Sequence, residues 1–440
     1  MANTEQNKQS DFMIEKIKER SVSSKRKLLR KTVTTASMAV IFGLIACLTF
    51  LILEPVFSNW LNPEEEPEIV VFPEEADEMA PEDMLVEEQK PSLQEAVESV
   101  ILEEEQIQKI LDNVKLDKSH YIQLYNAMSE YKKELNRSMV VVTGVSSDVD
   151  FFNDTYESKG QTYGVLVALN GKEYLILTEK KVIDQAETIT VTFLDGMKAD
   201  AQIKQSDSQT GLAVIAVPVS TLNDSTRKAL KLASLGTSNL VEPVGTPVMA
   251  LGCPMGTVGS VGYGMITSQG SLLGKVDANY LLYTTDIYGS GDGTGVLFDL
   301  DNHIIGVITE NRVSDELKYN ITAIGVSELR KLIEKMSNGK ELAYLGISGM
   351  DVTEEAHIEL GVPYGAYVKE VEMGSPAMLA GIQKGDVIVA INGNTIQKFA
   401  NYSTTLLNLE VGQSVKIVIQ RPVQSVYKEM EMEITLQTAN

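Results

Sequence analysis

Short, strand-forming runs fill most of the chain after Asn136. They are rich in Val, Ile, Thr and Tyr and are separated by Gly, Asn or Asp, as in SMVVVTGV, YLILT, TITVTFL, LAVIAV and HIIGVIT. Their spacing of roughly 8–12 residues is typical of β-sandwiches and of paired β-barrels. The pattern predicts an all-β domain over residues 137–326. No glycine-rich stretch between the runs reads G-x-x-x-x-G-K-[ST], so the sequence gives no support for nucleotide binding.

The length and the net charge of the chain limit its number of domains and its classes of partner. At roughly 100–200 residues a domain, the 440 residues indicate two or three domains. The formal net charge of -23 argues against nucleic acid as a partner, because such proteins need a basic face. Two cysteines, Cys47 and Cys253, are too few for a disulfide framework. The three histidines, His120, His303 and His357, can each be tested against a catalytic role.

An uncharged apolar run lies near the N-terminus. From Thr32 to Leu53 it reads TVTTASMAVIFGLIACLTFLIL, which matches the roughly 20 residues that a helix needs to span a bilayer. Basic residues precede the run and acidic residues follow it, so residues 1–31 are predicted to be a cytoplasmic tail, 32–54 a signal-anchor helix, and the rest extracytoplasmic. The protein would then be a single-pass protein of the cell membrane. A cleaved secretory signal is the alternative, but the run is long and no A-x-A-like site follows.

Acidic residues dominate the next segment. From Pro63 to Glu105 the chain has 17 Asp or Glu and one Lys, with repeated prolines, so residues 55–91 are predicted to be an extended acidic linker. Apolar residues at helical spacing then predict a helical stalk over 92–136, which would set the oligomeric state as a short coiled coil. His120 is expected to be a polar residue at the start of its second helix. The acidic residues have no metal-ligand spacing, so no metal or other cofactor is expected.

Three segments of the all-β region match one protease family in wording and order. They are LILTEKKVIDQAETITVTFLDGMKADAQIKQSDSQTGLAVIAV (Leu175–Val217), LGCPMGTVGSVGYGMITSQG (Leu251–Gly270) and TTDIYGSGDGTGVLFDLDNHIIGVIT (Thr284–Thr309). Residues 137–437 resemble the HtrA/Deg family of trypsin-like serine proteases, whose membrane-anchored forms carry a C-terminal PDZ domain. The resemblance implies a mainly β chain, with a trypsin-like double β-barrel over 137–326, a connecting helix over 327–339 and an α/β PDZ domain over 340–437.

The positions of the family's catalytic triad hold other residues here. The family carries its base in T-N-x-H-V-V, its acid in D-x-x-T-D-L-A and its nucleophile in G-N-S-G-G-P-L, and the matching stretches are TEKKVI, DSQTGLA and GDGTGVL. The resemblance therefore places Lys181, Gly211 and Gly293 at the His, Asp and Ser positions, with Thr294 at the glycine that follows. A serine nucleophile needs a base in contact with it and an acid that orients the base. The chain is predicted to be a pseudoprotease with no catalytic residue.

A rearranged active site is the alternative. Ser290 would be the nucleophile, and Lys181 would be the base of a Ser-Lys pair. Such a lysine needs burial, whereas its charged neighbours in sequence are typical of a surface. Cys253 has no histidine near it in the sequence and is expected to be a packed residue. His303, at a turn that leads into a strand, is expected to face solvent.

The end of the chain carries PDZ motifs of the same family, in order: GAYVKEV, S-P-A-x-x-A-G-I, K-G-D-V-I and I-N-G. The resemblance implies that backbone N–H groups of residues 344–347 capture a peptide's terminal carboxylate and that the peptide pairs with residues 347–349. On the facing helix, two apolar residues four apart would line a pocket for the last side chain or would simply fill the core. His357 is expected to lie away from this groove. The predicted peptide-binding residues are Tyr344, Leu345, Gly346, Ile347, Ser348, Gly349, Tyr402 and Leu406.

The sequence thus favours a membrane-anchored, extracytoplasmic pseudoprotease that acts as a scaffold or sensor in envelope protein quality control. Its partners would be exported or unfolded polypeptides and protein C-termini, and the family's fold implies a trimer with itself or with active relatives. The alternatives are an active HtrA-like serine endopeptidase with a rearranged site and a purely structural envelope protein.

Overall fold

The computed structural model describes residues 36–47, 49, 67–73, 118–149, 155–239, 242–309, 319–424 and 426–438. The chain divides into two compact units, Met1–Glu66 and Pro67–Asn440. In the first unit, residues 36–47 form a helix on which large apolar side chains such as Met38 and Phe42 are exposed. None of the helices described is both long and apolar enough to cross a membrane. The predicted span 32–54 lies partly outside the described residues, as do residues 1–31 and most of the predicted linker and stalk.

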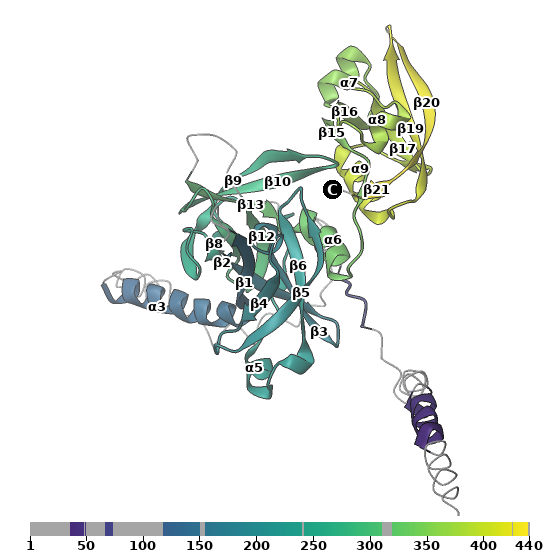
Figure 1. Cartoon of the computed structure of the whole chain (residues 1–440). Coiled ribbons are helices and arrows are strands. Elements are labelled where there is room, and N and C mark those ends of the chain that lie inside the picture. The colour runs from purple at the N-terminus through teal and green to yellow at the C-terminus, as the bar shows by residue number, and fades with distance from the viewer. Residues whose placement is uncertain are drawn as a thin grey trace, which may run out of the picture. The chain divides into compact units, whose positions relative to one another are not determined.

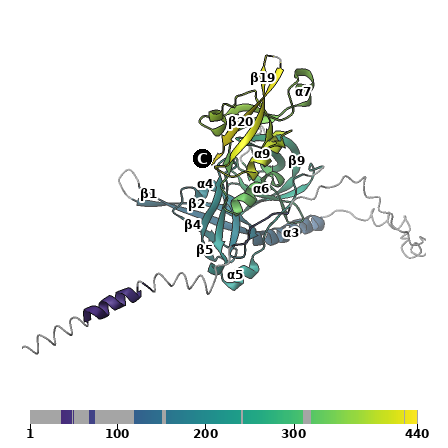
Figure 2. The same cartoon turned by 90° about the vertical axis from the view of Figure 1, so that its right-hand side faces the viewer.

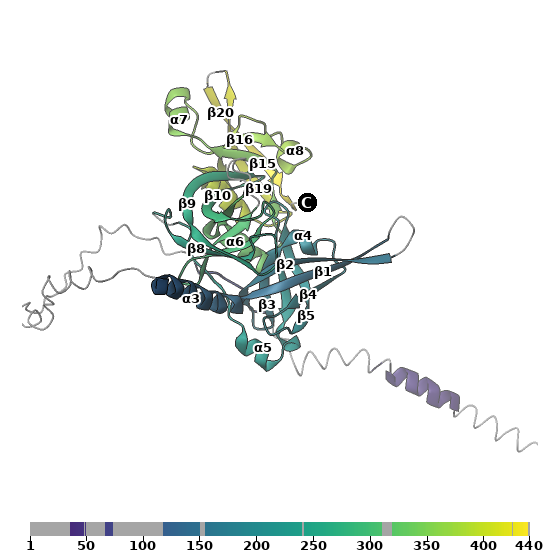
Figure 3. The same cartoon turned by 90° about the vertical axis from the view of Figure 1, so that its left-hand side faces the viewer.

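The second unit begins its regular structure with a helix and a closed barrel. Helix α3 (Lys118–Leu135) and the short η2 (Asn136–Ser138) lead into the first strand. Six described strands then close the barrel in the order β1-β2-β3-β6-β5-β4, and Figure 3 shows several of them side by side. The strands are β1 (Met139–Val149), β2 (Thr155–Leu169), β3 (Glu173–Glu179), β4 (Thr188–Thr192), β5 (Lys198–Asp207) and β6 (Leu212–Pro218). The helices between them are α4 (Lys180–Ile183), η3 (Val219–Thr221) and α5 (Asp224–Ala229).

A second sheet follows, with the described strands in the order β11-β8-β9-β10-β13-β12-β7. Strand β11 also pairs with β12, so the first strand of this order is joined to the last but one. The strands are β7 (Ser234–Leu235), β8 (Pro247–Cys253), β9 (Ser260–Lys275), β10 (Ala278–Tyr288), β11 (Thr294–Phe298), β12 (His303–Thr309) and β13 (Asn320–Gly325). The two sheets confirm the predicted trypsin-like double β-barrel.

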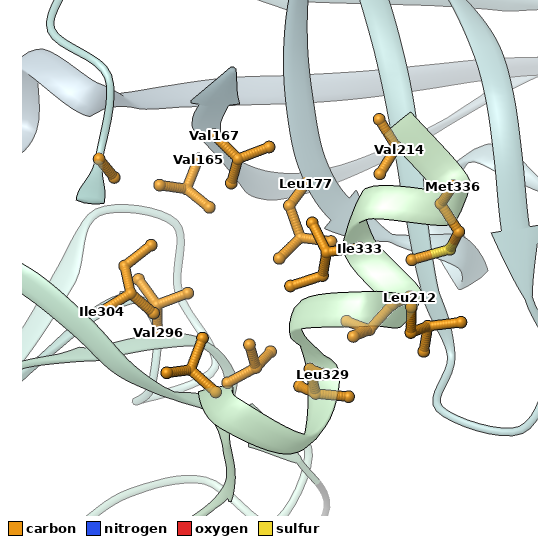
Figure 4. Packing of buried hydrophobic residues seen from close by; sticks show 14 of the residues in the cluster. Val165, Val167, Leu177, Leu212, Val214, Val296, Ile304, Leu329, Ile333 and Met336 are labelled. Atoms are coloured by element: carbon orange, nitrogen blue, oxygen red, sulfur yellow. The ribbon is translucent and has the colours of Figure 1, made fainter. Parts of the chain in front are cut away.

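Helix α6 (Val326–Ser337) supplies much of the core that both barrels share. Its apolar positions recur at helical spacing, so that Leu329, Ile333 and Met336 form one buried face. Figure 4 shows this face packed near Leu177 of the first barrel and Val296 of the second, all in one hydrophobic cluster. Because burying one such side chain stabilises a fold by about 1.5–3 kcal/mol, α6 holds the barrels together.

The same helix contacts the C-terminal part of the chain. Lys335 is buried, and its ammonium donates hydrogen bonds to the carbonyls of Leu407 (2.9 Å) and Leu409 (2.7 Å). These carbonyls end helix α9 (Phe399–Asn408), where a cation also complements the helix dipole. The linking helix therefore caps a helix of the following domain.

That domain has the predicted α/β PDZ architecture. Its sheet runs β15-β16-β17-β19-β20, with β15 at an edge, and β14 pairs with β21. Helix α9 appears beside this sheet in Figure 2. The strands are β14 (Ala343–Tyr344), β15 (Ile347–Asp351), β16 (Ala366–Val371), β17 (Val387–Ile391), β18 (Asn394–Thr395), β19 (Ser414–Val423), β20 (Val426–Thr435) and β21 (Gln437–Thr438). The remaining helices are α7 (Glu354–Leu360) and α8 (Pro376–Ala380).

The motif residues of this domain have structural roles. The Ser375 side chain caps α8 by accepting from the N–H of Met378, Pro376 starts the helix, and Gly381 ends it at a φ of 87°. The buried Asp386 receives two hydrogen bonds from Arg421, at 2.8 and 2.7 Å. A bidentate pair of this kind fixes the relative positions of the segments that carry it.

Candidate functional site

Two cavities lie beside the positions that the resemblance assigns to the catalytic triad, although Gly293 itself lines neither of them. The first, of about 390 Å³, is lined by Lys181, Gly211 and Thr294, which come from α4, the turn before β6 and the start of β11. The second, of about 600 Å³, is lined by Lys181, Thr294 and Cys253, among others. The fold thus brings together three segments that lie about 30 to 80 residues apart in the sequence. Residues common to both cavities are Thr162, Glu179, Lys181, Asp184 and Thr294.

The base position is an exposed lysine. Lys181 lies in α4 with its side chain exposed, whereas the neighbouring Lys180 forms an ion pair with Asp184 at 2.5 Å. The N–H of Lys180 donates to the carbonyl of Gly211 at 2.8 Å, which joins the base and acid positions through the backbone. An exposed ammonium stays solvated, so Lys181 lacks the buried environment of a lysine base.

The acid position is a left-handed glycine. Gly211 has a φ of +73°, a conformation that side chains other than Asn and Asp rarely adopt. The nearest aspartate in the sequence, Asp207, is buried, and its carboxylate accepts hydrogen bonds from the N–H of Gln209 and from the N–H and hydroxyl of Thr210. Asp207 therefore stabilises the turn that contains the acid position.

The nucleophile position has no room for a side chain. A Cβ added to the buried Gly293 would lie 2.6 Å from the carbonyl oxygen of Pro254 and 3.0 Å from that of Ser290. The N–H of Gly293 donates to the Ser290 carbonyl at 2.9 Å, and the N–H of Ser290 donates to Pro254 at 2.9 Å. An oxyanion hole needs the nucleophile's N–H free to reach the substrate, and here that group is engaged within the loop.

The rearranged nucleophile lacks a base among the described residues. Ser290 is half-buried, lines neither cavity, and its hydroxyl accepts a 3.4 Å hydrogen bond from the N–H of Asp292. No histidine lines either of the two cavities. His303 lies at the start of β12 with Nδ1 3.1 Å from Asp299, and the His357 ring stacks on Tyr364 at 4.0 Å. His120 belongs to α3.

Cys253 is the one thiol at these cavities in the part of the chain that the structure describes. It ends β8 opposite Thr294 in register and is 7% exposed. Burial raises the pKa of the Cys253 thiol, against the lowering effect of hydrogen bonds that involve Tyr163, Thr294 and Thr162. A raised pKa leaves little of the reactive thiolate, so this cysteine has the character of a packed residue.

The predicted carboxylate loop of the PDZ domain has its N–H groups directed at a single carboxylate. Leu345 donates to Asp277 Oδ2 at 2.8 Å, Gly346 donates to the same oxygen at 2.8 Å, and Ile347 donates to Oδ1 at 3.0 Å. Gly346 has a φ of +90°, and a Cβ there would lie 2.3 Å from that of Ser375. Only glycine therefore permits this loop conformation.

The other predicted groove residues lie on both sides of this loop. Tyr402 and Leu406 of α9 are buried at 0% and 3% exposure, and the Tyr402 hydroxyl donates to Asp277 Oδ1 at 2.5 Å. Burial and the adjacent Asp277 charge raise the pKa of Tyr402, so the hydroxyl stays protonated and able to donate. Ser348 and Gly349 follow along the edge strand β15, and Tyr344 precedes the loop in β14.

Sequence reasoning missed Asp277. It lies in the two-residue turn between β9 and β10, some 70 residues before the loop that it contacts. Aspartate is common in turns, and no local pattern marks this one as a partner of a distant loop.

Comparison with known proteins agrees with this architecture. Residues 162–307 match the trypsin-like peptidase domain, and residues 367–421 match the PDZ domain. The chain is HtrA-like, with a trypsin fold followed by a PDZ domain. The solved structure of the HtrA-type protease AlgW with decapeptide shares this fold at a TM-score of 0.50 and 21% identity, over 70% of this chain and 99% of that one.

The curated relatives of this HtrA-like chain are named as serine proteases. The Bacillus subtilis serine protease Do-like HtrA is 26% identical over 70% of this chain and 72% of its own. The Escherichia coli periplasmic pH-dependent serine endoprotease DegQ is 28% identical over 62% and 59%. The Brucella suis probable periplasmic serine endoprotease DegP-like is 28% identical over 56% and 48%. The HtrA-like chain therefore spans about half the length of several relatives that it matches.

Proposed function

We propose that this HtrA-like chain is a membrane-anchored, extracytoplasmic pseudoprotease that binds polypeptide C-termini through its PDZ domain. It would serve as a scaffold or sensor for exported proteins in the cell envelope, with itself or active relatives as further partners. The observation that carries the proposal is the nucleophile position, where a backbone carbonyl occupies the space that a serine side chain would need.

The rest of the cleft supports the absence of cleavage. Of the groups that a serine protease requires, the base position is an exposed Lys181, the acid position is Gly211, and the oxyanion N–H of Gly293 is bonded within its own loop. Without a base, a hydroxyl at neutral pH is a weak nucleophile. The cavities retain the volume of a binding cleft but lack the groups for acyl transfer.

Membrane anchoring rests on the first unit of the chain. The described helix 36–47 belongs to the uncharged run 32–53 and exposes its apolar side chains, which favour an apolar surrounding. The basic residues before that run favour a cytoplasmic N-terminus. The word periplasmic in the names of two relatives agrees with an extracytoplasmic body.

Self-association is supported by the described part of the predicted stalk. Helix α3 exposes four large side chains within five positions, among them Tyr121 at 63% and Leu124 at 54%. Apolar residues on an exposed helix gain stability when another helix covers them.

Activity-based labelling tests the loss of cleavage. The full chain in detergent would be treated with a fluorophosphonate probe and, separately, with casein, and the Bacillus subtilis relative would serve as the active control. We expect no labelling and no casein fragments from this chain while the control shows both. A label that mass spectrometry maps to Ser290 would support the alternative of a rearranged active endopeptidase.

A further inference from the structure

The PDZ carboxylate loop is already filled by a side chain of the second barrel. Both oxygens of Asp277 accept hydrogen bonds from the three loop N–H groups, and Tyr402 adds a fourth donor. The loop thus surrounds a carboxylate of the same chain in the way expected for the carboxylate of a peptide C-terminus. Figure 1 shows the ends of β9 and β10, which flank Asp277, beside α9.

The backbone of the turn also engages the strand edge where a peptide would pair. The N–H of Asp277 donates to the carbonyl of Ile347 at 2.7 Å, and the side-chain amide of Asn279 donates to the carbonyl of Gly349 at 3.0 Å. Strand β15 carries these carbonyls and is an edge of its sheet. An added peptide strand would need such edge groups for its own hydrogen bonds.

The charge of Asp277 is unusual for an ordinary domain contact. Among the described residues no Lys or Arg forms an ion pair with it, and its carboxylate accepts instead from the backbone N–H groups of the loop and from the Tyr402 hydroxyl. Burial raises the pKa of the Asp277 carboxyl, and the hydrogen bonds from Ile347 and Tyr402 oppose that rise. If this contact only joined two domains, apolar residues could make it without the free-energy cost of removing a charge from water. The presence of a carboxylate at this point therefore indicates that the loop retains its preference for a carboxylate.

We infer that the β9–β10 turn is an internal ligand of the PDZ groove, which a polypeptide C-terminus must displace in order to bind. The inference rests on the proposed function, namely that the groove takes C-terminal tails. Displacement exchanges one carboxylate for another in the same set of donors. A tethered ligand acts at an effective concentration on the order of millimolar. A free tail can bind only the grooves that are open, so its apparent affinity falls in proportion as that open fraction becomes smaller.

Peptide binding to an Asp277→Asn variant tests the inference. Asparagine keeps nearly the same size and tolerates the φ of 61° at this position, but it removes the charge. Asp200→Asn, on the exposed face of β5, is the control with the same change in charge. The probe is a pool of fluorescein-labelled heptapeptides with an apolar last residue and a free carboxylate, and the same pool with amidated ends is the second control.

We expect the free-carboxylate pool to bind the full-length Asp277→Asn chain at least ~10-fold more tightly than the wild type. Asp200→Asn should match the wild type, and the amidated pool should bind none of the three proteins. Equal binding by wild type and Asp277→Asn would overturn the internal ligand while leaving the proposed PDZ function in place. Binding by neither would overturn the proposed PDZ function. Hydrogen exchange at residues 345–347 that is the same in wild type and Asp277→Asn would then overturn the internal ligand as well, whereas faster exchange in the variant would support it.

A measurement on the wild-type chain covers the case in which the variant folds poorly. Excess free-carboxylate pool should accelerate hydrogen exchange at the Asp277 amide, because its bond to the Ile347 carbonyl is lost, while residues 345–347 stay protected. Protection of the Asp277 amide that does not change at saturating peptide would refute displacement.

Discussion

Replacing Gly293 with alanine should destabilise the second barrel. The added Cβ would lie 2.6 Å from the Pro254 carbonyl oxygen, well inside normal contact, so the backbone of one segment must move. Overpacking of this kind costs about 1–3 kcal/mol, and the smaller conformational entropy of the unfolded alanine chain offsets about 0.4–1 kcal/mol. We therefore expect a net loss of about 1–2 kcal/mol. Movement of Pro254 would also weaken its hydrogen bond from Ser290.

The same loop offers a matched control. Gly291 lies two residues earlier, has nothing within 4 Å of an added Cβ and has a φ outside the left-handed region. Gly291→Ala should leave stability unchanged or raise it by up to about 1 kcal/mol. The assay is native-state hydrogen exchange of the Ser290 and Gly293 amides, supported by thermal unfolding followed by circular dichroism. Equal exchange rates in the two variants would refute the steric reasoning.

Three further results are expected. The combined variant Lys181→His, Gly211→Asp, Gly293→Ser should neither cleave casein nor bind a fluorophosphonate, because the introduced serine has no room beside the Pro254 carbonyl; cleavage at the rate of an active relative would contradict this. The Cys253 thiol should react with iodoacetamide at least ~10-fold more slowly in the folded chain than in urea, and faster as the pH rises toward its raised pKa, as followed by mass spectrometry. Arg421→Met should cost about 3–5 kcal/mol in urea unfolding because it leaves a buried carboxylate unpaired, whereas Lys416→Met, which breaks an exposed pair, should cost at most about 1 kcal/mol.

The fold was predictable because its signals are local and repeated. Short strand-forming runs with turn residues between them indicated a β-sandwich or paired β-barrels, and the resemblance implied the double barrel. The motif residues Ser375, Pro376 and Gly381 each fit the helix end that they form. The resemblance implied a connecting helix over 327–339, and α6 (Val326–Ser337) lies there. Such patterns depend on backbone conformation within a few residues, which the sequence specifies directly.

The candidate site was predictable only in its residue identities. The sequence showed a glycine at the nucleophile position, but the approach of Pro254 that fills the space beside it depends on how two loops pack. The contact between Asp277 and the PDZ loop likewise joins segments some 70 residues apart. Long-range juxtapositions of this kind arise from tertiary packing, and a single sequence carries no pattern for them.

The cap that Lys335 places on α9 bears on where the C-terminal domain can be cut. The predicted boundary at residue 340 follows the motifs, yet the ammonium that satisfies the carbonyls of Leu407 and Leu409 lies before it. A fragment that starts at 340 would leave the end of α9 without these bonds, and α9 carries the Tyr402 that faces the carboxylate loop. The smallest fragment that keeps the PDZ groove intact therefore includes α6. Peptide affinities measured on a shorter fragment would describe a groove in which α9 is less firmly held.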